Sequence, residues 1–180
     1  MDKSMFSFKL VDTKAPETVI KDSLKQIASA TQGYVTGDIQ EYDGPIRSYT
    51  KKVELTAAFA PFQATSETIK VNIQDDLGEQ NNQKNRFEVF LTVKGLEHYK
   101  YRMMFIDYGS VSYPVTIVLN EMLAAAYSGR KIEMFRISSM KELEDMMDSI
   151  INSSEMILFL QNLINEALRR ENENAADIQE

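Results

Sequence analysis

The 180-residue chain contains no cysteine and only one histidine, His98. Without cysteine it has no disulfide, no thiolate nucleophile and no cysteine-ligated zinc or iron–sulfur site. A single histidine cannot build a multi-histidine metal site, and the sequence has no G-x-S-x-G motif of the kind that marks serine hydrolases. We therefore predict no catalytic residue, no metal site and no cofactor. An enzyme that uses tyrosine, lysine or glutamate, such as a nuclease, stays open as an alternative.

Glycine-rich loops and long apolar runs are also missing. The seven glycines are scattered and form neither a Walker A motif nor a G-x-G-x-x-G loop. The longest apolar-rich stretch, residues 114–127, is too short to cross a bilayer and contains Asn120 and Glu121. Residues 1–14 lack the apolar core of a signal peptide. These features predict a soluble cytoplasmic protein that does not bind membranes.

Positive charge is in the minority, with 20 basic against 27 acidic residues and a net charge of −7. This balance disfavours generic binding to nucleic acid, since long-range repulsion opposes it. A local basic patch is the exception, because residues 84–102 contain an excess of lysine and arginine. There Lys94, Lys100 and Arg102 are predicted to share an exposed face of a hairpin. That face is either a docking patch for an acidic partner or a phosphate backbone, or a solvated edge that resists aggregation.

Alternation of apolar and polar residues predicts a sheet in the first two thirds of the chain. A helix is predicted to begin at Pro16 and to end near Gly33, with apolar residues at helical spacing between them. Residues 75–86 are almost entirely polar and are predicted to form a loop. The predicted strands are 6–10, 34–42, 47–59, 68–73, 87–93 and 98–107.

The clearest predicted hairpin pairs residues 87–93 with 98–107 through a turn at 94–97. Alternate residues of a regular strand share a face, so the rings and the cations of the second strand are expected to separate. The face predicted to be core carries Tyr99, Tyr101, Met103 and Phe105. The opposite face carries His98, Lys100, Arg102, Met104 and Ile106. This separation argues against a stacking platform for single-stranded nucleic acid, which needs rings and cations together.

The last third of the chain changes from alternation to helical spacing. The predicted elements are a buried helix over 114–128, a short strand over 132–137, and helices over 140–151 and 155–171. Gly129 is expected to end the first of these helices, and Ser139 with Glu142 has the spacing of a capping box at the start of the second. Residues 171–180 are polar and acidic and are predicted to be a disordered tail.

Together these elements predict an α+β fold in which residues 1–170 form a single domain. A curved, mainly antiparallel sheet of about five to seven strands is expected to carry an N-terminal helix and two or three C-terminal helices on one face. The order of elements resembles that of helix-grip folds, which wrap an antiparallel sheet round a long C-terminal helix and hold a hydrophobic ligand. By that analogy a small-molecule carrier with an apolar pocket is one alternative for the function.

The C-terminal helices offer two kinds of candidate binding surface. One is apolar, because the helices hold more apolar residues than a single buried stripe needs, and it includes Met146 and Phe159. The other is the acidic helix face of Glu142, Asp145 and Asp148. We predict a non-enzymatic interaction protein, such as an adaptor, accessory subunit or inhibitor, that binds a protein partner or forms a homodimer. A second alternative is an acidic inhibitor that imitates a nucleic-acid backbone.

Overall fold

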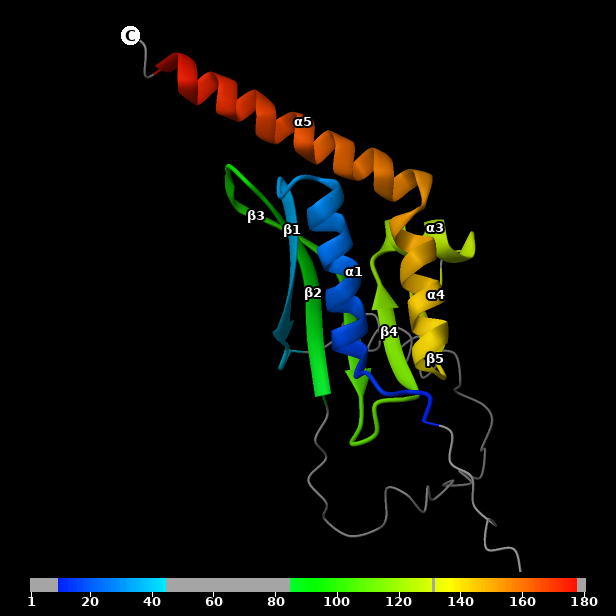
Figure 1. The fold of residues 1–180 in the computed structure, drawn as a ribbon. Coiled ribbons are helices and arrows are strands. Elements are labelled where there is room, and N and C mark those ends of the chain that lie inside the picture. Colours follow the sequence, from blue (N-terminus) through cyan, green and yellow to red (C-terminus); the bar gives the residue numbers. More distant parts are fainter. Residues whose placement is uncertain (1–9, 45–84, 131, 178–180) are drawn as a thin grey trace, which may run out of the picture.

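The computed structural model describes residues 10–44, 85–130 and 132–177 (Figure 1). This part of the chain forms an open antiparallel sheet with the strand order β1-β2-β3-β4-β5. The strands are β1 (Val35–Glu41), β2 (Asn85–Val93), β3 (Leu96–Tyr108), β4 (Val115–Leu119) and β5 (Met134–Ile137). The helices are α1 (Pro16–Ala30), α3 (Glu121–Ser128), α4 (Met140–Ile151) and α5 (Ser154–Asp177). The predicted α+β fold, with a curved antiparallel sheet, an N-terminal helix and C-terminal helices, is confirmed.

Several predicted elements cannot be compared with the structure. The predicted strands at 47–59 and 68–73 lie outside the described residues, and so does nearly all of the strand at 6–10. Most of the predicted loop at 75–86 also lies outside them. Its last two residues, Asn85 and Arg86, are not loop but the start of β2, because they pair with Tyr108 and Asp107 of β3.

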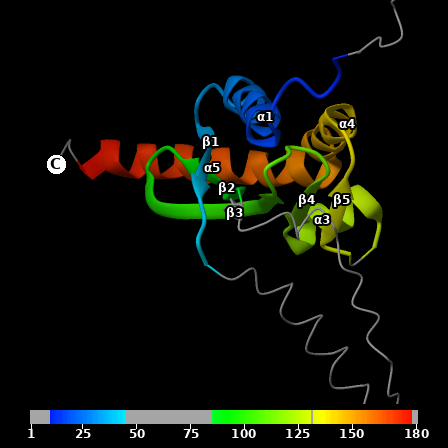
Figure 2. The same ribbon diagram turned by 90° about the horizontal axis from the view of Figure 1, so that it is seen from below.

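The core lies between one face of the sheet and the helices α1, α4 and α5. Seen along the sheet, α1 and α4 lie on the same side, with α5 crossing near them (Figure 2). Helix α1 approaches β1 closely at Gly37, where an added side chain would meet Leu24. The largest fully buried side chains are Ile20, Ile27, Leu91, Met103, Met104, Ile106, Ile117, Leu123, Leu143, Met146, Met147 and Ile150. Among the described residues, no helix is long and apolar enough to span a membrane.

The segment after Pro114 departs from the prediction of one continuous helix. Residues Val115–Leu119 form β4, which pairs with β3 on one side and with β5 on the other. Only Glu121–Ser128 is helical, starting after Asn120, whose side chain accepts a hydrogen bond from the backbone amide of Leu123. The β-branched run in β4 favours a strand, and its two neighbours in the sheet satisfy the backbone groups. Gly129 ends α3 in the left-handed conformation, as predicted.

The alternation of β3 is interrupted at Met103. Val89 pairs with Met104 and Phe90 pairs with Arg102, so Met103 of β3 has no paired residue in β2. Such a bulge moves the following side chains to the other face of the sheet. Met103 and Met104 are consequently both buried. The prediction that Phe105 shares a face with Met103 is wrong for the same reason, because Phe105 lies beside Arg102.

The starts of the last two helices follow the predicted pattern. Ser139 caps α4 by accepting a hydrogen bond from the amide of Glu142, and the Glu142 carboxylate accepts one from the amide of Ser138. After a break at residues 152–153, α5 runs past the predicted end at Glu171 and continues to Asp177. It crosses the end of the sheet where β2 turns into β3 and extends beyond it (Figure 1).

Candidate functional site

The face of the sheet opposite the helices, hereafter the far face, carries a buried charge cluster centred on Glu88. Only 8% of Glu88 is exposed, although it is a carboxylate in the middle of β2. Its oxygens lie 3.1 Å from the Lys100 ammonium and 2.7 Å from the Arg102 guanidinium, both on β3. Lys100 also donates a hydrogen bond to the side chain of Gln40 on β1. The cluster therefore ties three adjacent strands together.

The environment of Glu88 keeps it charged. Burial alone would raise the pKa of this carboxyl group, but hydrogen bonds from Arg102 and Lys100 and their positive charges outweigh burial and hold the pKa below its usual value. A carboxylate that receives two cations has little capacity left for a ligand or for proton transfer. We interpret the cluster as a structural ion pair network rather than a reactive site.

Aromatic rings lie in the same cluster, contrary to the predicted separation of rings and cations. The Lys100 ammonium lies 3.6 Å from the centre of the Phe90 ring, and the Arg102 guanidinium lies 4.9 Å from that of Phe105. The Tyr42 ring packs against Phe105 with 4.7 Å between centres. Phe90 is buried even so, with 4% exposed. Phe105 lies beside Arg102 because the bulge at Met103 moves Phe105 to the face that carries Arg102.

Lys94 does not join Lys100 and Arg102. It sits in the turn between β2 and β3, where its ammonium lies 3.0 Å from the Glu171 carboxylate of α5 and 5.2 Å from the centre of the Tyr34 ring. The Tyr34 hydroxyl donates a second hydrogen bond to Glu171. The predicted basic face is therefore divided between two places, and in both of them the cations already have acidic partners. Lys94 serves to fasten α5 to the hairpin.

Two of the acidic candidates on α4 have partners within the chain, and Met146 is part of the core. Glu142 caps the helix through Ser138, and Asp145 pairs with Lys141 at 3.0 Å. Asp148 is exposed. Met146 is only 1% exposed and belongs to the core, so it offers no surface to a partner. Glu142 and Asp145 are exposed as well, so these three carboxylates all reach the surface of α4.

Phe159 anchors the start of α5 rather than pointing into solvent. Its ring is half-buried and packs on Tyr101 of β3, with 4.3 Å between the ring centres. The Tyr101 hydroxyl in turn accepts a hydrogen bond from the Asn120 side chain, and it lies 3.9 Å from the Met122 sulfur. This contact connects α5 with β3 and with the start of α3.

The remaining surface of α5 is the strongest candidate site. The helix buries Met156, Leu160, Leu163 and Ala167 against the body of the protein. The opposite side of the helix exposes apolar side chains to solvent: Ile157 is 46% exposed, Leu158 59% and Leu168 39%. We call this side, residues 158, 161, 165 and 168 with Ile157 beside them, the outer face of α5. Exposed apolar groups along one side of a helix are typical of a surface that another molecule covers.

The outer face was partly recognisable in the sequence. The excess of apolar residues in this helix, Leu158 and Leu168 among them, points to it, but the sequence-based prediction names Phe159 as the binding residue. Their positions follow once the buried stripe is known, because they fall on the opposite side of a helix with 3.6 residues per turn. The sequence pattern alone does not reveal which of two apolar stripes packs on the sheet.

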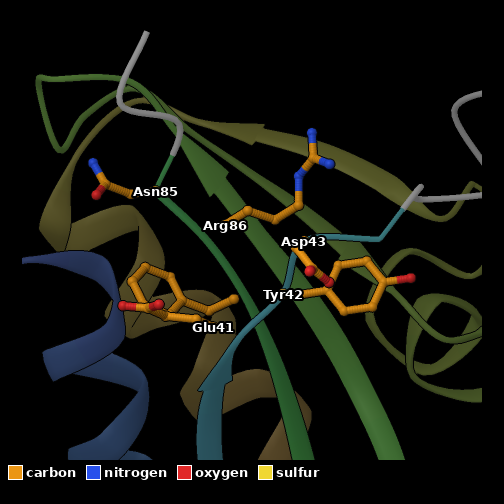
Figure 3. Close-up of a pocket in the computed structure, with 6 residues that line it drawn as sticks. Glu41, Tyr42, Asp43, Asn85 and Arg86 are labelled. Carbon is orange, nitrogen blue, oxygen red and sulfur yellow. The ribbon is translucent and has the colours of Figure 1, made fainter. Parts of the chain in front are cut away.

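A cavity of about 640 Å³ lies where β1 ends and β2 begins. Figure 3 shows Glu41 and Tyr42 pointing to opposite sides of the chain, with Asn85 and Arg86 beyond them on β2. The Arg86 guanidinium is held by the Asp107 carboxylate at 3.1 Å and by the carbonyl oxygen of Gly44. Because its charge is already paired, we interpret Arg86 as a structural residue that connects β2 with β3 and with the segment after β1.

Acidic residues and histidine do not gather anywhere in the described part of the chain as a group of three or more able to hold a metal ion. Comparison of the chain with models of known protein families, with curated proteins and with solved structures finds no match. The function must therefore be argued from the surface of the molecule itself, and the outer face of α5 is its most distinctive part.

Proposed function

We propose that this chain is a non-enzymatic interaction protein that binds another macromolecule through the outer face of α5. The observation that carries the proposal is the exposure of Leu158, at 59%, together with Ile157 and Leu168 on the same helix. Leaving such side chains in water costs free energy, at about 25 cal/mol for each square ångström of apolar surface. A partner that covers them recovers this free energy.

The helix is well placed to present this surface. Its inner side is fixed by buried residues, by the contact of Phe159 with Tyr101, and by the pairing of Lys94 with Glu171 near its far end. A helix fixed along its length loses little conformational freedom on binding, which favours affinity. The charged candidate surfaces support the proposal less, because Lys94, Lys100 and Arg102 have carboxylate partners within the chain.

Cross-linking from the outer face in the cells that make the protein tests the proposal. Position 158 is replaced by a photoreactive phenylalanine derivative and the sample is illuminated. We expect one discrete cross-linked product, because a bound partner lies within a few ångströms of this position. The matched control places the same residue at position 149, which is also exposed on a helix but lies on α4. Absence of a discrete product from position 158, or equal products from both positions, would contradict the proposal.

A further inference from the structure

The outer face of α5 has the same residue pattern in both directions along the helix. Leu158, Gln161, Asn165 and Leu168 are all exposed and are separated by three, four and three positions. The sequence of side chains is leucine, amide, amide, leucine, and its midpoint is position 163. Spacings of three and four place all of these residues on one side of a helix, as in the seam of a coiled coil.

We propose that the occupant of the outer face is a second copy of this chain, with the two α5 helices packed antiparallel. The inference rests on the proposed function, because it names the partner for the same surface. A two-fold axis requires a surface that is complementary to itself, so that residue i meets residue j and residue j meets residue i. A pattern symmetric about its own midpoint meets that requirement in the antiparallel orientation.

The contacts follow from the midpoint at position 163. Leu158 of one copy lies against Leu168 of the second copy, and the same contact recurs at the other end. Gln161 lies against the second copy's Asn165. Side-chain amides have both donors and acceptors, so these central pairs satisfy one another by hydrogen bonding. Polar amides within an apolar seam also fix the register and the number of helices.

Charge along one flank of the seam supports the same orientation. Glu155, Asn162 and Arg169 are seven positions apart, so they follow the seam on one side, and all three are exposed. In an antiparallel pair this flank faces the same flank of the second copy, which brings Glu155 near the second copy's Arg169 at each end. Arg169 already bonds Glu166 and Glu173 of its own helix, but its side chain is 61% exposed and accessible to a further carboxylate. Opposed helix dipoles favour the arrangement as well.

The absence of cysteine from the chain allows a direct test of both partner and orientation. Two variants are prepared separately, Leu158→Cys and Leu168→Cys, and are oxidised either alone or after mixing. Positions 158 and 168 lie about 15 Å apart along a helix, and a disulfide needs Cα atoms within about 7 Å. In an antiparallel dimer, disulfide-linked dimers therefore form in the mixture and not in either variant alone. Ser149→Cys on α4 serves as the control for random collision.

Sedimentation equilibrium of the unmodified full-length chain at tens of micromolar provides the second measurement. We expect a mass of twice 20.6 kDa. Leu158→Glu should lower this mass to that of one chain, because it places a carboxylate against the second copy's Leu168. Val111→Glu should leave the mass unchanged, since Val111 is 73% exposed but lies in the loop between β3 and β4.

The outcomes separate this inference from the proposed function. Disulfides in the mixture alone, with a dimeric mass, support the antiparallel dimer. Disulfides in Leu158→Cys alone overturn it, because they indicate parallel helices. A monomeric mass together with a discrete cross-link from position 158 to a different macromolecule also overturns it, but leaves the proposed function intact. A monomeric mass without any such cross-link overturns both.

Discussion

At the scale of single residues, the most informative side chain is Glu88, which is not among the binding residues predicted from the sequence. Glu88 occupies a polar position in an alternating strand, and such a position commonly faces solvent. It is buried because Lys100 and Arg102 stand on the neighbouring strand within 3.1 Å of its oxygens. A buried carboxylate costs free energy unless it is paired, and here two cations and a hydrogen-bond network provide the compensation. The ion pairs across the strands explain why this charge is tolerated.

Replacing Glu88 by glutamine should lower the free energy of unfolding by about 2 kcal/mol at pH 7, the scale of a hydrogen bond to a charged group. Because the folded state holds the pKa of Glu88 below its unfolded value, the stabilisation is fully present above about pH 4.5 and is lost as the pH falls through the folded pKa. The difference in free energy of unfolding between the wild type and Glu88→Gln should therefore be smaller in acid. Urea unfolding of both proteins at pH 7 and at pH 3 measures this difference.

The exposed Glu97 of the same hairpin provides the control for this prediction. Glu97→Gln removes the same charge without removing a buried ion pair, so its stability should stay within about 0.5 kcal/mol of the wild type. A stability loss of the same size in both variants would contradict the prediction, because it would attribute the loss to the change in net charge and not to the ion pairs of Glu88.

At the scale of elements, local patterns predicted most of the described strands and helices. Alternation located β2 and β3, the polar stretch at 34–42 was predicted to be extended and forms β1, and helical spacing located α1, α4 and α5. The failures occurred where contacts between distant residues decide the structure. The run from Val115 to Tyr127 is mostly apolar, so its periodicity does not distinguish a strand from a buried helix. Pairing with β3 and β5 makes its first part a strand.

The bulge at Met103 is a second feature that local pattern could not predict. Both Met103 and Met104 are buried, whereas strict alternation allows only one of them to face the core. No glycine or proline at this position marks the bulge. It exists because Val89 and Phe90 pair with residues two positions apart in β3, and this relation between strands has no signature in either strand alone.

The start of α4 shows an element whose terminus was predictable. The Ser139 hydroxyl accepts a hydrogen bond from the amide of Glu142, an amide that has no partner within the helix. Ser139→Ala should therefore lower the free energy of unfolding by about 1 kcal/mol. The control is Ser149→Ala, which replaces an exposed serine in the interior of the same helix and should slightly stabilise it, because alanine has the higher helix propensity. Chemical unfolding of both variants measures the difference, and an unchanged stability of Ser139→Ala would contradict the role of the cap.

At the scale of the whole molecule, one face of the sheet is packed under three helices, and the last of these helices keeps an apolar side free. The fold class was predictable because the change from alternation to helical spacing is visible in the sequence. The binding surface was only partly predictable, because exposure depends on which side of α5 the sheet occupies. The carrier and the acidic inhibitor stay predictions that the structure does not test, and the outer face of α5 favours the interaction protein.

The native size of the protein in extract from its own cells tests the central claim most directly. Wild type, Leu158→Glu and Val111→Glu are compared by size-exclusion chromatography without dilution. We predict that wild type and Val111→Glu elute as a complex larger than 20.6 kDa, and that Leu158→Glu elutes as the single chain. Elution of the wild type as a single chain of that mass, or of Leu158→Glu in the same complex as the wild type, would contradict binding through the outer face of α5.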